Sequence, residues 1–199
     1  AAFLEEGAEV GTMTLTIRPA GHRLVSGTSS SGLLRLWGAK RVIIDGIDDE
    51  DHSLRVRNNA TTGTGAALSI QSGASDCVVE HTIFEGGNEG AALEVVQTTG
   101  SLSQIEIERI RIRGNTVRGL SSSQWPVAGI RVWKGIVSTR PQDIRIERNR
   151  VLQFRQYGIR VGQTDNAQVV DNEVSLSAAV ATSVPLYGIG VEESGAVVE

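Results

Sequence analysis

Apolar and polar residues alternate with a period of two along most of this chain. Two such patterns occur, and copies of one alternate with copies of the other. The first pattern is a pair of mostly small residues, then apolar, variable and apolar residues. It recurs at Gly32–Leu36, Ala66–Ile70, Ala91–Val95, Ala128–Val132, Tyr157–Val161 and Tyr187–Val191. The second has two apolar positions, a polar pair, a small polar residue and a further apolar residue. It recurs at Cys77–Phe84, Ile110–Val117, Ile144–Val151 and Ala167–Val174, and more faintly at Val42–Ile47. Period-two alternation predicts β-strands.

The spacing of these strands predicts how they pack. Copies of the first pattern follow one another at intervals of 25 to 37 residues, and no helical periodicity separates them. Parallel strands that recur in this way without helices form a solenoid, in which like strands of successive coils lie about 4.8 Å apart. An antiparallel sandwich is the alternative, but it requires hairpin turns at intervals of about 8–12 residues. The sequence therefore predicts an all-β chain built as a parallel β-helix.

One column of the second pattern is polar although its neighbours are apolar. Thr82, Asn115, Asn149 and Asn172 occupy the same position in successive copies. Asparagine is depleted from ordinary strands, but stacked amides can bond one another and the backbone at a bend. We therefore expect the three asparagines to be buried and stacked on consecutive coils.

The same register places opposite charges side by side on outward positions. It puts Arg113 next to Glu147, and Arg150 next to Glu173. Such neighbours stabilise a sheet by about 0.2–1 kcal/mol per pair.

The segments that carry these patterns and their bends include Leu15–Ala20, Val25–Gly27, Leu33–Leu36, Gly38–Gly46, Leu54–Asn59 and Gly65–Leu68. On these segments the chain resembles bacterial right-handed parallel β-helix repeat proteins, most of all the large secreted or surface forms with a C-terminal sorting domain. The resemblance runs from about residue 11 to the end of the chain. It implies a secreted or cell-surface setting and a right-handed coil, and it carries no catalytic motif. We predict a right-handed parallel β-helix, or β-solenoid, of about five to six coils.

The length of 199 residues fits one β-helix domain spanning residues 1–199. The first residue is not Met, and the last residues resemble an unfinished strand. We therefore expect both ends to be truncated relative to a parent protein, whose other domains would flank this one.

Composition excludes several classes of function. The net charge of −4 argues against general nucleic-acid binding, which requires a basic surface. The single cysteine excludes an intrachain disulfide framework and a multi-cysteine zinc site. No apolar run approaches the roughly 18 residues of a membrane span. Nothing in the sequence calls for a cofactor.

Arginine and tryptophan gather on the outward positions of the first pattern. The candidate ligand-binding residues are Arg35, Trp37, Glu94, Arg131, Trp133 and Arg160. Tryptophan rings can stack on the apolar face of a sugar, and guanidinium groups can clamp carboxylate or sulfate groups. The alternative, which we favour because most charges on strand faces are only solvated, is that the rings fill corners and the arginines form solvated ladders with Glu94.

The register also places Arg131 and Arg160 on adjacent coils, about 4.8 Å apart. Glu94 can balance Arg131 but leaves Arg160 without a partner in this column. An extended acidic polysaccharide could supply the missing anion, and it is the partner that we predict. The competing interpretation is that Arg160 reaches an acidic loop residue such as Asp165.

Other polar groups give weaker signals. The acidic run that contains Asp45, Asp48, Asp49 and Asp51 lacks the spacing of a calcium loop. An exposed, solvated turn is the favoured interpretation, so we assign no metal ligand, and a calcium site there stays an open question.

The remaining nucleophilic and basic groups show no catalytic arrangement. His22, His52 and His81 have neither metal-ligand spacing nor a partner at a fixed distance, and His81 is expected to be a polar residue exposed at a bend. Cys77 takes an inward position, so we expect a core residue rather than a nucleophile.

Two classes of function remain. The first is a secreted or cell-surface module without catalysis, a scaffold or adhesin-like stalk with carbohydrate binding on one strand face. The second is a polysaccharide lyase or glycoside hydrolase acting on an acidic polysaccharide. A hydrolase requires two carboxylates that flank a groove, and Glu94 is the only central carboxylate on the candidate face. We therefore prefer the first class and assign no catalytic residue.

Overall fold

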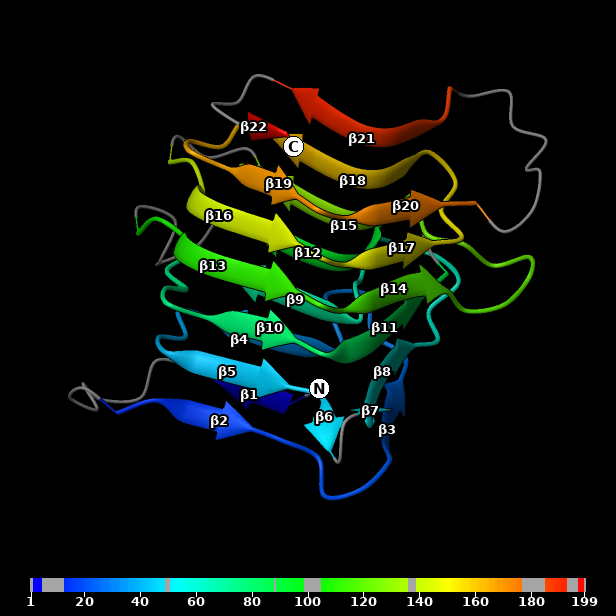
Figure 1. The fold of residues 1–199 in the computed structure, drawn as a ribbon, viewed down its shortest axis with the longest axis horizontal. Coiled ribbons are helices and arrows are strands. Elements are labelled where there is room, and N and C mark those ends of the chain that lie inside the picture. The colour runs from blue at the N-terminus through cyan, green and yellow to red at the C-terminus, as the bar shows by residue number, and fades with distance from the viewer. Residues whose placement is uncertain are drawn as a thin grey trace.

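The computed structural model describes residues 2–4, 13–48, 51–87, 89–98, 105–135, 139–176, 185–192 and 197–198. Their strands form three long sheets that run side by side along the molecule (Figure 1). Sheet 1 contains, in spatial order, β1 (Ala2–Leu4), β4 (Leu34–Trp37), β9 (Leu68–Gln71), β12 (Ala91–Val96), β15 (Ala128–Trp133), β18 (Tyr157–Gly162) and β21 (Tyr187–Glu192). Sheet 2 contains β2 (Leu15–Ile17), β5 (Val42–Asp45), β10 (Val78–Glu80), β13 (Glu108–Arg113), β16 (Gln142–Glu147), β19 (Gln168–Val170) and β22 (Val197–Val198).

Sheet 3 contains β3 (Arg23–Gly27), β8 (Leu54–Asn58), β11 (Thr82–Gly86), β14 (Thr116–Gly119), β17 (Arg150–Leu152) and β20 (Glu173–Ser175). Among the described residues every pairing within these sheets is parallel, and only the short hairpin of β6 (Ile47–Asp48) and β7 (Asp51–His52) is antiparallel. Each coil contributes one strand to each sheet in turn. The prediction of a parallel β-helix is confirmed.

The core is a stack of aliphatic columns inside the coil. In sheet 1 the inward column of Leu36, Ile70, Val95, Val132 and Val161 is in register, and each of these side chains is at most 2% exposed. No single coil can bury its apolar face alone. Burial of apolar surface stabilises the fold by roughly 25 cal/mol per Å², and each coil gains this free energy only when its neighbours are in place.

The first pattern begins with small residues because larger side chains would clash with the neighbouring strands. A Cβ on Gly129 would lie 2.2 Å from Val151 Cγ1, and one on Gly158 would lie 2.1 Å from Val174 Cγ1. At this corner the strands of sheet 3 approach the start of the sheet 1 strands, which leaves no room for a larger side chain.

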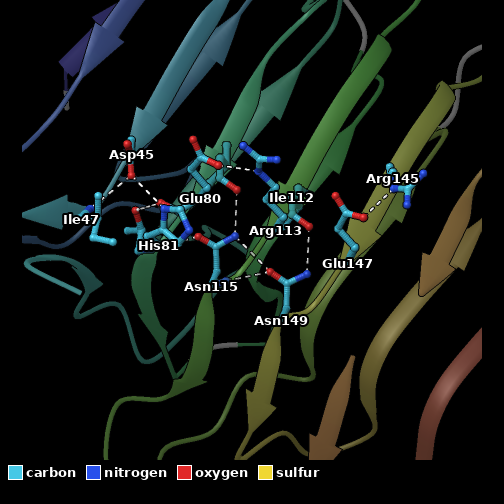
Figure 2. A network of polar contacts seen from close by, with 12 residues as sticks. Asp45, Ile47, Glu80, His81, Ile112, Arg113, Asn115, Arg145, Glu147 and Asn149 are labelled. Carbon is cyan, nitrogen blue, oxygen red and sulfur yellow. Dashed lines mark hydrogen bonds and ion pairs between the residues drawn. The ribbon is translucent and has the colours of Figure 1, made fainter. Parts of the chain in front are cut away.

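The asparagine column forms a ladder at the bend between sheets 2 and 3 (Figure 2). Asn115 Nδ2 donates to Val79 O at 2.9 Å and to Asn149 Oδ1 at 3.0 Å. Asn149 Nδ2 donates to Asn172 Oδ1 at 2.9 Å, and the Thr82 N–H donates to Asn115 Oδ1 at 3.0 Å. Asn115 and Asn149 are each 1% exposed, while Asn172 is half-buried. The predicted stacking is confirmed, and the predicted burial is confirmed for Asn115 and Asn149 but not for Asn172.

The residue before each step of this ladder adopts the left-handed conformation. The φ angles are 51° at His81, 61° at Gly114, 53° at Arg148 and 54° at Asp171. A non-glycine residue with positive φ is uncommon, yet here it recurs on successive coils. The ladder and the left-handed residue together turn the chain from sheet 2 into sheet 3.

The outward charges follow the predicted register with one change of partner. Arg113 lies opposite Glu147, but its Nε donates to Glu80 Oε2 at 2.5 Å, on the preceding coil. Arg150 pairs with Glu173 at 3.3 Å, as expected.

Cys77 is fully buried, and burial raises the pKa of its thiol to about 11. The prediction of a core residue is confirmed. No segment within the described ranges qualifies as a membrane-spanning helix, because none combines helical structure with the necessary length and hydropathy.

Candidate functional site

A chain of hydrogen bonds crosses four strands on the outward face of sheet 1. Arg35 donates from Nη2 to Gln71 Oε1 at 2.5 Å, and Gln71 Nε2 donates to Ser69 Oγ at 2.9 Å. Ser69 Oγ donates to Glu94 Oε1 at 2.8 Å, and Arg131 Nη2 donates to Glu94 Oε2 at 2.6 Å. The parallel register aligns these side chains, so β4, β9, β12 and β15 each contribute to a single network.

Glu94 is the centre of this network. The residue is only 6% exposed, and its two oxygens are occupied by Ser69 and Arg131. A buried carboxylate requires such partners because an uncompensated charge away from water is costly. The prediction that Glu94 balances Arg131 is confirmed.

A groove of about 390 Å³ lies over this network. Its lining residues are Ser30, Ser31, Arg35, Trp37, Thr64, Gln71, Glu94, Val96, Thr98 and Arg131. Four of the six residues singled out from the sequence therefore meet in one groove. The sequence pattern did not indicate Ser30, Ser31 and Thr64, because these residues belong to irregular segments outside the repeat.

Trp37 and Arg35 form the end of the groove at β4. The Arg35 guanidinium carbon lies 5.1 Å from the centroid of the Trp37 ring. Two buried donors of the groove, Trp37 Nε1 and Arg131 Nε, have no acceptor among the described residues. Each of these two atoms is therefore a buried polar group that the fold leaves unsatisfied.

Arg160 and Trp133 lie outside this groove and have partners of their own. Arg160 Nη2 donates to Glu192 Oε2 at 2.8 Å, and its guanidinium carbon lies 4.6 Å from the Trp133 ring centroid. It also lies 4.8 Å from the ring centroid of Tyr157. The expectation that Arg160 lacks a partner is wrong, and so is the alternative partner Asp165, which pairs with Arg140 at 3.4 Å.

The pairing of Arg160 is diagonal, which explains why one column alone did not show it. Directly opposite Arg160 stands Gly190, and Glu192 stands opposite Gly162. Glycine leaves room for the neighbouring side chains, since a Cβ on Gly162 would lie 2.7 Å from the Trp133 ring. The Trp133 ring therefore lies against Gly162, and Arg160 bonds Glu192 in the neighbouring column.

A second polar cluster lies at the sheet 2 bend, where Asp45, Glu80 and His81 meet (Figure 2). Asp45 Oδ1 is 3.0 Å from His81 Nδ1, and Asp45 Oδ2 is 2.7 Å from Arg18 Nη2. Asp45 is 2% exposed and Glu80 is 7% exposed. Two expectations are corrected here. Asp45 is a buried strand residue rather than part of an exposed turn, and His81 does have a partner at a fixed distance, although it stands at a bend.

Three members of the acidic run give no further information about calcium. Asp49 lies outside the described residues, as do the side chains of Asp48 and Asp51. For Asp45, burial acts to raise the pKa, but hydrogen bonds from His81, the Ile47 N–H and Arg18 outweigh it and hold the pKa below its usual value. Asp45 is therefore an anion at neutral pH.

The described lining of the groove does not contain the pair of carboxylates that glycoside hydrolysis requires. Glu94 is the only carboxylate among its described lining residues, and both of its oxygens are already bonded. A carboxylate held in this way suits charge pairing better than proton transfer.

The topology defines the class of the protein as a parallel β-solenoid. The family model described as "Right handed beta helix region" matches residues 42–198. The chain belongs to this family, and its coil is right-handed. Comparison with curated proteins and with solved structures finds no match.

Proposed function

We propose that the protein is a non-catalytic β-helix module of the cell surface or the secreted space that binds an extended acidic polysaccharide along sheet 1. The observation that carries the proposal is the groove, which brings together Arg35, Trp37, Glu94 and Arg131. The site spans β4 to β15, about 14 Å at the usual strand spacing, so it suits an extended chain rather than a single small molecule.

The chemistry of the groove favours an anionic ligand. Two arginines face a single carboxylate among the described lining residues. The Arg131 side chain is 24% exposed, so its guanidinium remains partly open to a ligand, and carboxylate or sulfate oxygens are strong acceptors for such a group. An aromatic ring beside a guanidinium can contact the apolar face of a sugar while the cation binds its acidic group.

The lining of the groove limits the extent of this site. Arg160 and Trp133 are not among the lining residues, and Glu192 pairs with Arg160 beyond the groove. The binding surface is therefore the groove from β4 to β15, and Trp133 with Arg160 forms a supporting stack beyond it.

The extracellular setting follows from the resemblance to secreted β-helix repeat proteins. In that setting the stack of coils would act as a stalk or scaffold that presents the groove, with any flanking domains of the parent chain at its ends. Detection of the full-length protein in the culture medium or on intact cells would support this setting, and its confinement to the cytoplasm would contradict it.

Binding can be tested by titration at low salt with polygalacturonate, alginate and heparin, with dextran as the uncharged comparison. We expect binding to the acidic polymers that weakens as salt is added. Arg35→Ala should reduce the affinity about tenfold, a loss typical of a charge-assisted contact. Arg148→Ala is the matched control, because its side chain is 76% exposed on the bend between sheets 2 and 3.

Two results would contradict the proposal. The first is an absence of binding to any acidic polymer at low salt. The second is equal affinity of the Arg35→Ala and Arg148→Ala variants, which would place binding elsewhere. Release of shortened or unsaturated sugar products during the titration would contradict the non-catalytic assignment and favour a lyase or hydrolase.

A further inference from the structure

Three ligating side chains from two adjacent coils converge at the sheet 2 bend. Asp45 is the last residue of β5 and stands opposite Glu80, the last residue of β10. His81 follows directly in the left-handed conformation, with a φ of 51°. One ligand atom from each residue lies within 4.8 Å of the others (Figure 2).

The two neighbouring arginines each bind one oxygen of a carboxylate. Arg18 bonds Asp45 Oδ2, and Arg113 bonds Glu80 Oε2. Asp45 Oδ1 is the oxygen bonded by His81 Nδ1. Glu80 Oε1 accepts no hydrogen bond from the described residues, although Glu80 is only 7% exposed. Glu80 Oε1 is therefore a carboxylate oxygen that is open to a cation, while Oε2 is held by Arg113.

The donor set selects the type of cation. Calcium and magnesium prefer oxygen ligands alone, whereas zinc and its neighbours in the first transition row bind imidazole nitrogen together with carboxylate oxygen. Three protein ligands and one open position are usual for a zinc site that is not purely structural.

We propose that Asp45, Glu80 and His81 form a binding site for a divalent transition-metal ion of the zinc type. The ion would take Asp45 Oδ1, Glu80 Oε1 and a ring nitrogen of His81, and it would tie two successive coils together beside the β6–β7 hairpin. This site lies on sheet 2 and is independent of the glycan groove on sheet 1.

Arg18 and Arg113 compete with a metal ion for the two carboxylates. Arg18 and Arg113 neutralise the two carboxylates before an ion enters, which lowers the attraction for a cation. Removal of one positive charge should therefore strengthen metal binding, whereas removal of a ligand should weaken it. Arg113 is the better choice because its side chain is 46% exposed and its removal leaves the core untouched.

The test uses metal-free protein without an affinity tag, titrated with zinc chloride in a calorimeter and with cobalt chloride in an absorbance cell. We expect one equivalent of zinc to bind and cobalt to show the visible bands of a nitrogen–oxygen site. His81→Gln should lower zinc affinity at least about tenfold, as loss of a ligand exceeds the cost of losing its supporting partner. Arg113→Gln should raise the affinity.

His22→Gln is the matched control, because His22 is an exposed histidine in the bend before sheet 3. It should bind zinc as the unmodified protein does, and circular dichroism of all variants checks that they fold. An absence of saturable zinc binding, or equal losses in the His81→Gln and His22→Gln variants, would overturn the proposal. An Arg113→Gln variant with unchanged affinity would overturn the assignment of Glu80 as a ligand.

Discussion

The asparagine ladder and the sheet 1 groove are both rows of polar residues in register on successive coils, but they satisfy their polar groups differently. In the ladder, Asn115 and Asn149 are buried and both their amide groups are bonded. In the groove, the hydrogen-bond chain through Glu94 runs from Arg35 to Arg131, and two buried donors beside it, Trp37 Nε1 and Arg131 Nε, have no acceptor among the described residues.

This difference separates polar residues that stabilise the fold from polar residues that can bind a ligand. A ladder whose members bond one another has no capacity left for a ligand, and its cost of burial is compensated inside the fold. A row that lines a groove retains part of that capacity, since the Arg131 side chain is 24% exposed there. The two rows therefore predict different outcomes of mutation: loss of stability alone in the ladder, and loss of binding, with a smaller loss of stability, in the groove.

The largest effect on stability is expected from Asn149→Ala. The substitution removes the bonds to Ile112 O, Asn172 and Asn115, and leaves buried backbone and amide groups unpaired. Because each such group costs about 1–3 kcal/mol, the free energy of unfolding should fall by about 3 kcal/mol. Urea unfolding measures it, with Asn59→Ala as the exposed control. Equal stability of the two variants would show that the ladder is dispensable.

A smaller loss is expected from Arg131→Ala in the groove. Glu94 would keep Ser69 as a partner but lose its counter-ion while remaining buried, at a cost of about 2 kcal/mol. Adding Glu94→Gln should restore part of this stability, since the unpaired charge is removed. A double-mutant cycle by chemical denaturation measures the coupling, and strict additivity of the two changes would argue against the pair.

Acid should weaken sheet 3 through Glu85, a buried carboxylate bonded by Arg57 and Arg118, with Arg55 at 4.0 Å. Burial acts to raise the pKa of Glu85, but the two bonded arginines outweigh it and hold the pKa below its ordinary 4.5. The stability that it contributes is therefore complete above about pH 4.5 and is lost as pH falls through the lower folded-state value.

Unfolding titrations from neutral to acidic pH measure this loss. Glu85→Gln should flatten the dependence on pH below about 4.5, whereas Glu173→Gln, at an exposed carboxylate, should leave it unchanged. A Glu85→Gln variant with the same acid profile as the unmodified protein would contradict the assignment.

The smallest effect on binding is expected from Arg160→Ala. Glu192, Trp133 and Tyr157 already surround this guanidinium, so its removal should leave the affinity for acidic glycans unchanged. The same titration shows a clear loss for Arg35→Ala if the groove is the binding surface. A loss of affinity in the Arg160→Ala variant that matches Arg35→Ala would extend the site to β18.

Much of the fold could be predicted because strand period and repeat spacing are local properties of the chain. The ladder followed from asparagine at one position of the second pattern, and the Glu94–Arg131 pair followed from register alone. The Arg160–Glu192 pair could not be predicted in this way. It is diagonal: Glu192 stands opposite Gly162, and the residue directly opposite Arg160 is Gly190, which has no side chain to pair.

Period and register along the chain are enough to predict a coil of parallel strands, the columns that face inward and the polar residues that stack. What the bends bring together is visible only in the folded molecule. Asp45 and His81 are 36 residues apart and meet because a left-handed residue turns the imidazole back onto the preceding coil. Likewise, Ser30 and Thr64 join the groove through irregular segments that no periodic pattern describes. Distances across a coil depend on how each bend is shaped, and that shape arises only when the neighbouring coils pack against it.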